Sequence, residues 1–315
     1  MRKAACNGSA HNGLKSRPCK AMIAILGAGS LGRLWAATLP AGQVAFVPRP
    51  GQAPDPICYR FQPIEGESFG VTIPWLQPGQ SPELLLVTTK AGDTLEALKA
   101  ALPSIASSTP IVLFQNGLGS QQQVAATWPQ RPVLAASTTE GANRPEQGLT
   151  VHAGCGATWV GALNPTGQPL VNRVAQQLAE SRLEVHPEQD ILGRLWQKLV
   201  INAGINAFTA ILDCPNGEIL KQPFYQQWID PLCEEISRLL GAAAQPKQAP
   251  EALRDGIEAV ARRTATNTSS MRADMLAGRP TEIDFINGYL ARLGQQHGIT
   301  TPVNQMLTER VQQLD

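Results

Sequence analysis

The feature that most constrains the fold is a short apolar run that leads directly into a glycine turn. Residues 22–26 read Met-Ile-Ala-Ile-Leu, as a strand buried on both faces of a parallel sheet requires. Gly27, Gly29 and Gly32 follow with dinucleotide-binding spacing, and residues 31–39 then show the pattern of a helix. At this spacing glycines allow a tight turn, a close backbone approach to a pyrophosphate, and close packing of the helix on the sheet. We therefore expect a phosphate-binding turn made of Gly27, Ala28, Gly29, Ser30, Leu31 and Gly32.

Apolar runs and helical stretches alternate through the first half of the chain. Further strands are predicted at residues 44–47, 84–88, 111–114, 133–139, 159–161 and 184–186. Helices are predicted between them at 93–102, 120–128 and 171–181. Residues 48–83 are rich in Pro, Gly and Gln, with weak strand signals near Tyr59 and Val71. The alternation is typical of a doubly wound Rossmann domain with a parallel sheet and right-handed crossovers.

The second half of the chain shows only helical periodicity. Helices are predicted over residues 191–210, 223–240, 250–266, 282–298 and 303–313. We therefore predict an α/β chain with an NADP-binding Rossmann domain at 22–187 and an all-α substrate and catalytic domain at 188–315. Residues 1–21 contain Lys and Arg but no apolar run, and we interpret them as a disordered extension. A role in organelle targeting is the weaker alternative for this segment.

Composition narrows the class of protein. A length of 315 residues allows two domains with separate cores, and a net charge of +1 does not favour nucleic acid or an anionic membrane as a partner. No window approaches the apolar length that crosses a bilayer. The six cysteines form no C-x-x-C pair, so we expect a reducing cytoplasm and no metal site. The sequence does not fix the oligomeric state, for which a homodimer is one candidate.

The end of the second predicted strand indicates which dinucleotide the turn binds. An NAD site usually carries Asp or Glu there to bind the ribose 2′-hydroxyl. Here residues 48–50 are Pro-Arg-Pro, without an acid. Arg49 is either an ordinary solvated loop arginine or a planar donor to a 2′-phosphate. Because the acid is missing, we predict NADPH as the cofactor.

Polar residues follow two other predicted strands, and ligands of open α/β sheets bind beyond these carboxyl ends. Lys90 follows one strand and is either a surface charge or a cation beside the cofactor. Asn116 follows the next strand, in a turn whose glycines, Gly117 and Gly119, leave room for a flat ring. We interpret Asn116 either as a turn former that bonds its own backbone or as a contact to the nicotinamide ribose or the substrate.

One predicted helix of the second half carries an unusual polar face. In residues 195–206, Lys198, Asn202 and Asn206 recur at intervals of four and therefore stack on one side, amid mostly apolar positions. In one interpretation Lys198 extends to water and the asparagines cap or bridge neighbouring helices. In the other, one ammonium and two amides line a site for a small polar ligand with a reacting oxygen.

A second polar cluster occupies residues 264–271, which read Thr-Ala-Thr-Asn-Thr-Ser-Ser-Met, and is followed by Glu282. Because Asn267 and Ser270 lie in a dense polar stretch beside apolar residues, the cluster indicates the lining of a pocket. Glu282 taken alone has a simpler interpretation as a cap of the helix that follows it, since acids favour first turns.

These groups together fit the reduction of a carbonyl. Hydride from a nicotinamide adds to a ketone carbon, and an acid must stabilise the charge that grows on the oxygen and then supply a proton. Lys198 suits this role if it is partly desolvated and held by a carboxylate, and Glu282 is the best carboxylate available. Amides and hydroxyls can bind a substrate carboxylate or hydroxyl without adding charge near the lysine.

From Met22 almost to the C-terminus the chain resembles the ketopantoate reductase (2-dehydropantoate 2-reductase) family. Six motifs in the family's order carry the resemblance, at residues 27–32 (GAGSLG), 86–90 (LVTTK), 115–119 (QNGLG), 195–202 (LWQKLVIN), 214–218 (CPNGE), and 267–271 (NTSSM) with 281–288 (TEIDFING). Residues 1–21 have no counterpart in the family, and the connection at 48–83 is divergent.

The resemblance implies NADPH-dependent reduction of ketopantoate to (R)-pantoate, on the route to pantothenate and coenzyme A, in a cleft between two domains that close. It implies Lys198 as the general acid and Glu282 as the carboxylate that supports it. It places Asn116, Asn202, Asn206, Asn267 and Ser270 in the substrate pocket. It makes Arg49 and Lys90 basic residues on the cofactor side. We expect Asn116 and Glu282 to contact the cofactor as well.

Three functions stay open at this point. The first is a ketopantoate reductase, and the second is an NADPH-dependent reductase of another small 2-oxo acid, which the same residues would serve. The third is a silent NADP-binding sensor, which would bind the cofactor without turnover. Intact Lys198 and Glu282 argue against the third.

Overall fold

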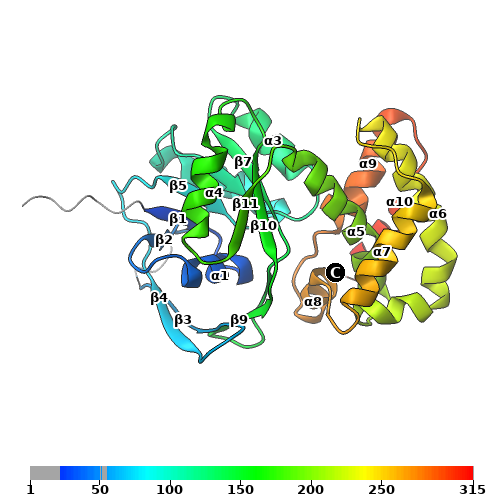
Figure 1. Cartoon of the computed structure of the whole chain (residues 1–315), viewed down its shortest axis with the longest axis horizontal. Helices are drawn as coiled ribbons and strands as arrows, with labels where there is room; N and C mark the ends of the chain where they lie inside the picture. Colours follow the sequence, from blue (N-terminus) through cyan, green and yellow to red (C-terminus); the bar gives the residue numbers. More distant parts are fainter. Residues whose placement is uncertain (1–21, 50, 52–54, 315) are drawn as a thin grey trace, which may run out of the picture.

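The computed structural model describes residues 22–49, 51 and 55–314, in a sheet domain followed by a helical domain (Figure 1). The fold class predicted from the sequence is confirmed. The predicted disordered extension, residues 1–21, lies outside the described residues.

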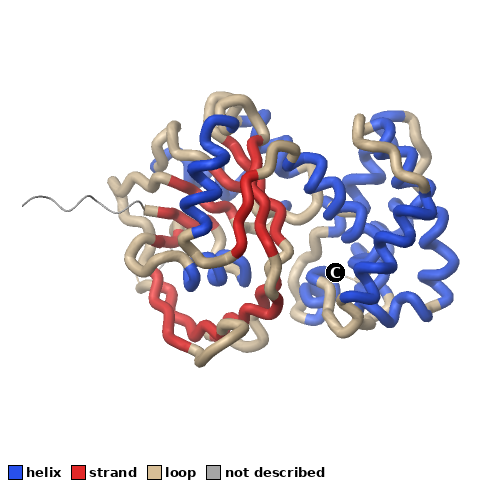
Figure 2. Tube along the Cα trace, in the orientation of Figure 1, coloured by secondary structure: helices blue, strands red, loops and turns tan. Residues whose placement is uncertain are grey.

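A seven-stranded sheet, red in Figure 2, forms the centre of the first domain. Its order is β11 (Glu184–Pro187), β10 (Ala157–Ala162), β7 (Val133–Thr138), β6 (Ile111–Leu113), β5 (Leu84–Val87), β1 (Ile23–Leu26) and β2 (Val44–Phe46). Strands β7 to β2 are parallel, as predicted, but β10 pairs antiparallel with β7 and parallel with β11. The sheet is mixed at this edge because no crossover helix links β7 to β10, and a parallel pair needs such a crossover.

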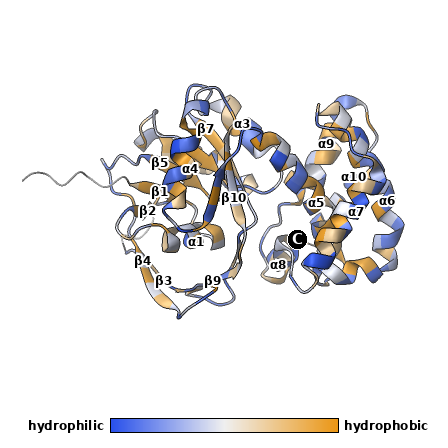
Figure 3. Cartoon of the chain, viewed as in Figure 1, coloured by the Kyte–Doolittle hydropathy of each residue, from blue (hydrophilic) through white to orange (hydrophobic). Residues whose placement is uncertain are grey.

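Side chains of β1 alternate between two cores on opposite faces of the sheet. Ile25 packs into a core shared with α1 and α4, whereas Leu26 packs into one shared with α2 and α3. The helices are α1 (Ser30–Thr38), α2 (Thr94–Ala101), α3 (Ser120–Thr127) and α4 (Val171–Ala179). Because both faces are covered, β1, β2, β5 and β6 are wholly apolar, and Figure 3 shows hydrophobic residues in this part of the sheet.

A second, four-stranded sheet packs over α1. Its order is β4 (Phe69–Ile73), β3 (Ile57–Gln62), β9 (Leu149–Gly154) and β8 (Gly141–Asn143). The strand signals near Tyr59 and Val71 are confirmed, while β8 and β9 were not predicted. Tyr59 is buried in the core that contains α1, and its hydroxyl donates to the backbone carbonyl of Arg33 at 2.6 Å.

The helical domain is built around the long helix α5. Its helices are α5 (Ile191–Ile211), α6 (Pro223–Ala242), α7 (Pro250–Arg263), α8 (Ser270–Leu276), α9 (Asn287–His297) and α10 (Pro302–Gln312). Single-turn or short 3-10 helices are η1 (Ala91–Asp93), η2 (Leu102–Ser104), η3 (Gln168–Leu170), η4 (Asn216–Lys221) and η5 (Ile283–Phe285). Leu195, Leu199 and Ala203 of α5 are buried in the core of this domain.

Two details of the helical domain differ from the sequence prediction. The helix expected at 282–298 begins only at Asn287, because the residues before it form a loop and η5. The helix expected at 250–266 ends at Arg263, and the polar stretch at 264–271 leads from there into a short helix, α8, which was not predicted. Its N-cap, Ser269, accepts the backbone N–H of Arg272 at 3.1 Å and exchanges a 2.7 Å hydrogen bond with Thr209 of α5.

Candidate active site

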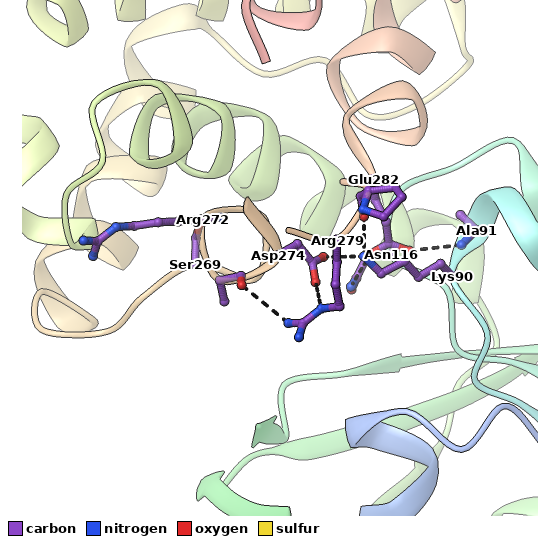
Figure 4. Close-up of polar contacts among 10 residues, drawn as sticks. Lys90, Ala91, Asn116, Ser269, Arg272, Asp274, Arg279 and Glu282 are labelled. Carbon is purple, nitrogen blue, oxygen red and sulfur yellow. Dashed lines mark hydrogen bonds and ion pairs between the residues drawn. The ribbon is translucent and has the colours of Figure 1, made fainter. Parts of the chain in front are cut away.

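The carboxyl ends of β5, β6 and β7 meet α5, α8 and the loop 277–282 of the helical domain. Figure 4 shows Lys90 and Asn116, from the sheet side, gathered against Asp274 and Glu282, from the helical side. Lys198 of α5 contacts the end of β7 at the same edge of the sheet. This is the edge at which open α/β sheets bind ligands, so the structure brings the two predicted catalytic residues to a chemically suitable place.

The glycine turn lies at the neighbouring strand end, and its geometry fits a dinucleotide. A Cβ at Gly32 would lie 2.1 Å from the carbonyl oxygen of Gly27, so only glycine lets α1 pack this close to the turn. Nothing lies within 4 Å of a Cβ built on Gly29, which leaves the outer side of the turn open. Gly29 provides no side-chain cap for α1, so the first N–H groups of the helix are available to a phosphate.

Lys198 is partly buried and donates from Nζ to the backbone carbonyl of Thr138, at the end of β7, over 2.8 Å. Burial lowers the pKa of Lys198 from 10.5 to about 8, and the negative charge of Glu282 opposes this shift. An amine with a pKa near neutrality can hold a proton and also release it, which suits a general acid. This backbone contact at position 138 was not predicted from the sequence.

Glu282 is fixed by two donors from the sheet domain. The N–H of Ala91 donates to Oε1 and the amide of Asn116 donates to Oε2, both at 3.1 Å. Burial raises the pKa of Glu282 above 4.5, while these two hydrogen bonds and the charge of Lys90 oppose the rise. Among the described residues no direct ion pair joins this carboxylate to Lys198, although the sequence led us to expect one. The charge of Glu282 instead acts on Lys198 at a distance, by raising the pKa of its amine.

Lys90 connects the two domains through a carboxylate that the sequence analysis did not single out. Its Nζ lies 2.8 Å from Oδ2 of Asp274 on α8 and also donates to the carbonyl of Pro280. Asp274 in turn accepts from Nε of Arg279 at 2.9 Å. Asp274 lies four residues after Ser270, so on a helix the two side chains share one face. This spacing is the sequence signal that links Asp274 to the predicted site residue Ser270.

The Asn116-Gly117 turn serves the contact between domains. Gly117 has a φ of +77°, and a Cβ there would lie 2.0 Å from the backbone oxygen of Phe285. The next residue, Leu118, donates its N–H to that same oxygen at 2.9 Å. Gly117 therefore allows the backbone of the helical domain to approach the turn closely. The sequence had suggested a different reason for this glycine, namely space for a ring of the cofactor.

The other predicted site residues lie on α5, at the start of α8 and after β2. Asn202 and Asn206 lie one and two turns beyond the lysine on α5, and Asn206 is buried. Asn267 and Ser270 are exposed, just before and at the start of α8, and Arg49 is exposed after β2. Within the part of the chain that the structure describes, no hydrogen bond joins these five side chains to the two catalytic candidates.

The Asp274–Lys90 contact is expected to hold the helical domain against the end of β5. We expect Asp274→Asn to speed amide hydrogen exchange at Ala91, whose N–H bonds Glu282, and in residues 277–282 by roughly tenfold. The reason is that the variant weakens a partly shielded charge-assisted hydrogen bond. Hydrogen exchange followed by mass spectrometry makes this measurement.

Asp213→Asn is the matched control for this prediction. Asp213 pairs at 2.9 Å with Arg272 of α8, the helix that also carries Asp274. This pair lies within the helical domain, and Asp213 is 70% exposed. Figure 4 shows Arg272 pointing away from the Lys90 group. Equal exchange at Ala91 in wild-type protein and Asp274→Asn would show that the ion pair does not hold the junction.

Comparison with known proteins places this arrangement in one family. The model "Ketopantoate reductase PanE/ApbA" matches residues 23–165, and "Ketopantoate reductase PanE/ApbA C terminal" matches residues 190–315. A 2-dehydropantoate 2-reductase from Vibrio cholerae is 35% identical over 303 residues, which cover 93% of this chain and 97% of that protein. The chain belongs to the ketopantoate reductase family. It is therefore an oxidoreductase of that family.

Solved structures share the fold of this ketopantoate reductase family member. A D-mandelate dehydrogenase with NADH and anilino(oxo)acetate matches with a TM-score of 0.83 and 22% identity, over 93% of this chain and 97% of that one. A dimeric ketopantoate reductase from Staphylococcus aureus matches with a TM-score of 0.77 and 18% identity, over 93% and 98% of the two chains. Among the described helices none combines the length and hydropathy of a membrane span.

Proposed function

We propose that this protein reduces 2-dehydropantoate to (R)-pantoate with NADPH, as a step toward pantothenate and coenzyme A in the cytoplasm. The observation that carries the proposal is the partly buried ammonium of Lys198, with a pKa of about 8, at the same edge of the sheet as the glycine turn. The identity to curated 2-dehydropantoate 2-reductases supports the choice of substrate. We also propose residues 22–187 and 188–315 as the two functional domains.

In this mechanism the residues of the chain position the substrate and move one proton. NADPH, when bound at the glycine turn, supplies the hydride. Lys198 stabilises the negative charge on the substrate oxygen and then donates a proton to it from Nζ. Glu282 keeps the amine protonated through its charge, and its hydrogen bonds to Ala91 and Asn116 hold it at the junction. Closure of the domains excludes water and strengthens the interaction between ammonium and alkoxide.

Recognition of the rest of the substrate falls to neutral groups. We assign the substrate carboxylate and hydroxyl to Asn116, Asn202, Asn206, Asn267 and Ser270. These side chains donate hydrogen bonds without adding a charge that would shift the pKa of Lys198. Lys90 is assigned to the cofactor side of the junction. A homodimer is the proposed assembly, in keeping with the dimeric relative.

The fold neighbour that acts as a D-mandelate dehydrogenase favours a second candidate, the reductase of another 2-oxo acid. The two functions are separated by measuring oxidation of NADPH at 340 nm with a panel of 2-oxo acids. We expect ketopantoate to exceed 2-oxoisovalerate in kcat/KM by at least about 10²-fold, because a site built to bond the substrate hydroxyl rejects an analogue that lacks it.

Other results of the panel would change the assignment. Equal efficiency with 2-oxoisovalerate contradicts the proposed substrate and supports the second candidate. Binding of NADPH without turnover of any 2-oxo acid would leave the silent sensor, the third function, in place of both reductases.

A further inference from the structure

The end of β7, which receives Lys198, continues into an acid–imidazole pair that the proposed mechanism does not use. Glu140 lies two residues beyond Thr138. Its Oε2 lies 2.6 Å from Nε2 of His152 on β9, and the side chains of Glu140 and His152 are only 2% and 10% exposed. A carboxylate with so little access to water needs a polar partner, and an imidazole with a hydrogen on Nε2 donates to it. The two residues therefore tie the end of β7 to β9.

This pair lies where the chain passes from the large sheet to the small one. Strand β7 pairs with β10 in the seven-stranded sheet, whereas β8, which starts at Gly141, pairs with β9 in the four-stranded sheet. The pairing of β8 with β9 is irregular between Gly141 and Ala142, and Ala142 lies opposite His152. Because the backbone changes its partner strand here, the side chain of Glu140 helps to fix the course of the chain.

The carbonyl of Thr138 takes its direction from the peptide plane between Thr138 and Thr139. The N–H of Thr139, in the same plane, donates to the carbonyl of Ala157 on β10 at 2.9 Å. In a trans peptide the N–H and the C=O point in opposite directions, so the carbonyl of Thr138 points away from β10. In this direction it accepts the hydrogen bond from Nζ of Lys198 at 2.8 Å.

The residues around this peptide plane are held from two sides. The N–H of Glu140 donates to Oγ1 of Thr138 at 3.1 Å, and the same oxygen accepts the hydroxyl of Thr158 on β10 at 2.8 Å. On the other side the carboxylate of Glu140 is bonded to His152. Because only Thr139 separates Glu140 from the Thr138 carbonyl, loss of the bond to His152 allows that carbonyl to turn.

We propose that Glu140 and His152 are positioning residues of the reductase, which hold the Thr138 carbonyl in the direction that places Nζ of Lys198. This inference rests on the proposed function, in which Lys198 donates the proton. A proton donor must lie within hydrogen-bond distance of the substrate oxygen, and an error of about 1 Å in its placement costs up to about 10²-fold in rate. The pair acts through the carbonyl and needs no contact with the substrate.

The inference is tested by steady-state kinetics of NADPH oxidation by the full chain, with ketopantoate as the 2-oxo acid. We expect Glu140→Ala to lower kcat by about 10- to 30-fold and to change the Kd for NADPH by less than about twofold. The alkaline decline of kcat/KM should move to higher pH, because an amine released from its place gains water and its pKa returns toward 10.5.

Two further substitutions show whether the pair acts as a unit. Glu140→Gln keeps a hydrogen bond to His152, so its kcat should stay within about threefold of the wild-type value. His152→Ala and the double variant Glu140→Ala/His152→Ala should lower kcat by the same factor as Glu140→Ala, because each removes the same interaction.

Glu184→Ala is the matched control. Glu184 of β11 also pairs with a histidine, His186, at 2.7 Å, but these side chains are 63% and 45% exposed. Its kcat and pH profile should equal those of the wild type, and the thermal midpoint of each variant reports whether it is folded.

Wild-type kcat and an unmoved alkaline decline in folded Glu140→Ala overturn the inference, even if the thermal midpoint falls, and leave the reductase proposal intact. If Glu140→Ala does not fold, the same result in His152→Ala overturns it. A wild-type chain that reduces no 2-oxo acid overturns the proposed function as well.

Discussion

Replacing Lys198 with alanine is expected to lower kcat for reduction of the 2-oxo acid by about 10²- to 10⁴-fold. The variant removes the only ammonium bonded to the end of β7 among the described residues, and with it the proton for the developing alkoxide. The Kd for NADPH should change by less than about twofold, because the glycine turn is untouched. Steady-state kinetics and fluorescence titration of NADPH measure the two quantities.

Lys221→Ala provides the control for loss of a positive charge from the helical domain. Lys221 is 74% exposed and pairs with Glu218. Its environment therefore differs from that of the partly buried Lys198. Near-normal turnover of Lys198→Ala would remove this lysine from the mechanism. A parallel loss of NADPH binding would instead indicate that the substitution disturbs the fold.

Replacing Glu282 with alanine is expected to lower kcat/KM by about 10²-fold. The N–H of Ala91 and the amide of Asn116 lose their acceptor, and each buried donor left without a partner costs about 1–3 kcal/mol. The charge that raises the pKa of Lys198 is also lost, so less of the amine is protonated near neutral pH. The measurement is kcat/KM at several pH values.

Glu282→Gln separates the two effects, because it keeps an acceptor but removes the charge. We expect an intermediate loss of roughly tenfold, with the alkaline decline in activity moved to lower pH. Glu218→Gln, at a 50% exposed position, is the control. An unchanged pH profile in Glu282→Gln would show that the carboxylate does not influence the lysine.

Much of the sheet domain was predictable because its signals are local. The apolar β1, the glycine spacing and the helical start of α1 lie within 17 consecutive residues, 22–38. The reversal of β10 was not predictable from its own residues, since strand direction depends on whether the preceding connection contains a helix. Strands β8 and β9 were not predicted because their residues show no clear alternation and because β9 also pairs with β3, a partner distant in sequence.

In the candidate site, too, the local signals were predictable and the contacts between distant parts of the chain were not. Lys198 stood out because its ammonium interrupts an apolar helix, and Glu282 because it follows a dense polar stretch. The partners of Lys198 and Lys90, and one of the two partners of Glu282, could not be read from the sequence. Thr138 contributes only its backbone, Ala91 only an N–H, and Asp274 belongs to a seven-residue helix whose periodicity is too short to detect.

The pH dependence of kcat/KM for reduction tests the role of Lys198 most directly. A general acid must be protonated, so the account predicts constant activity below a pKa of about 8 and a tenfold fall per pH unit above it. Oxidation of the 2-hydroxy acid should show the opposite dependence, and residual activity of Lys198→Ala should lack the transition near pH 8. A wild-type profile that stays level to pH 9.5, or the same transition in Lys198→Ala, would contradict the account.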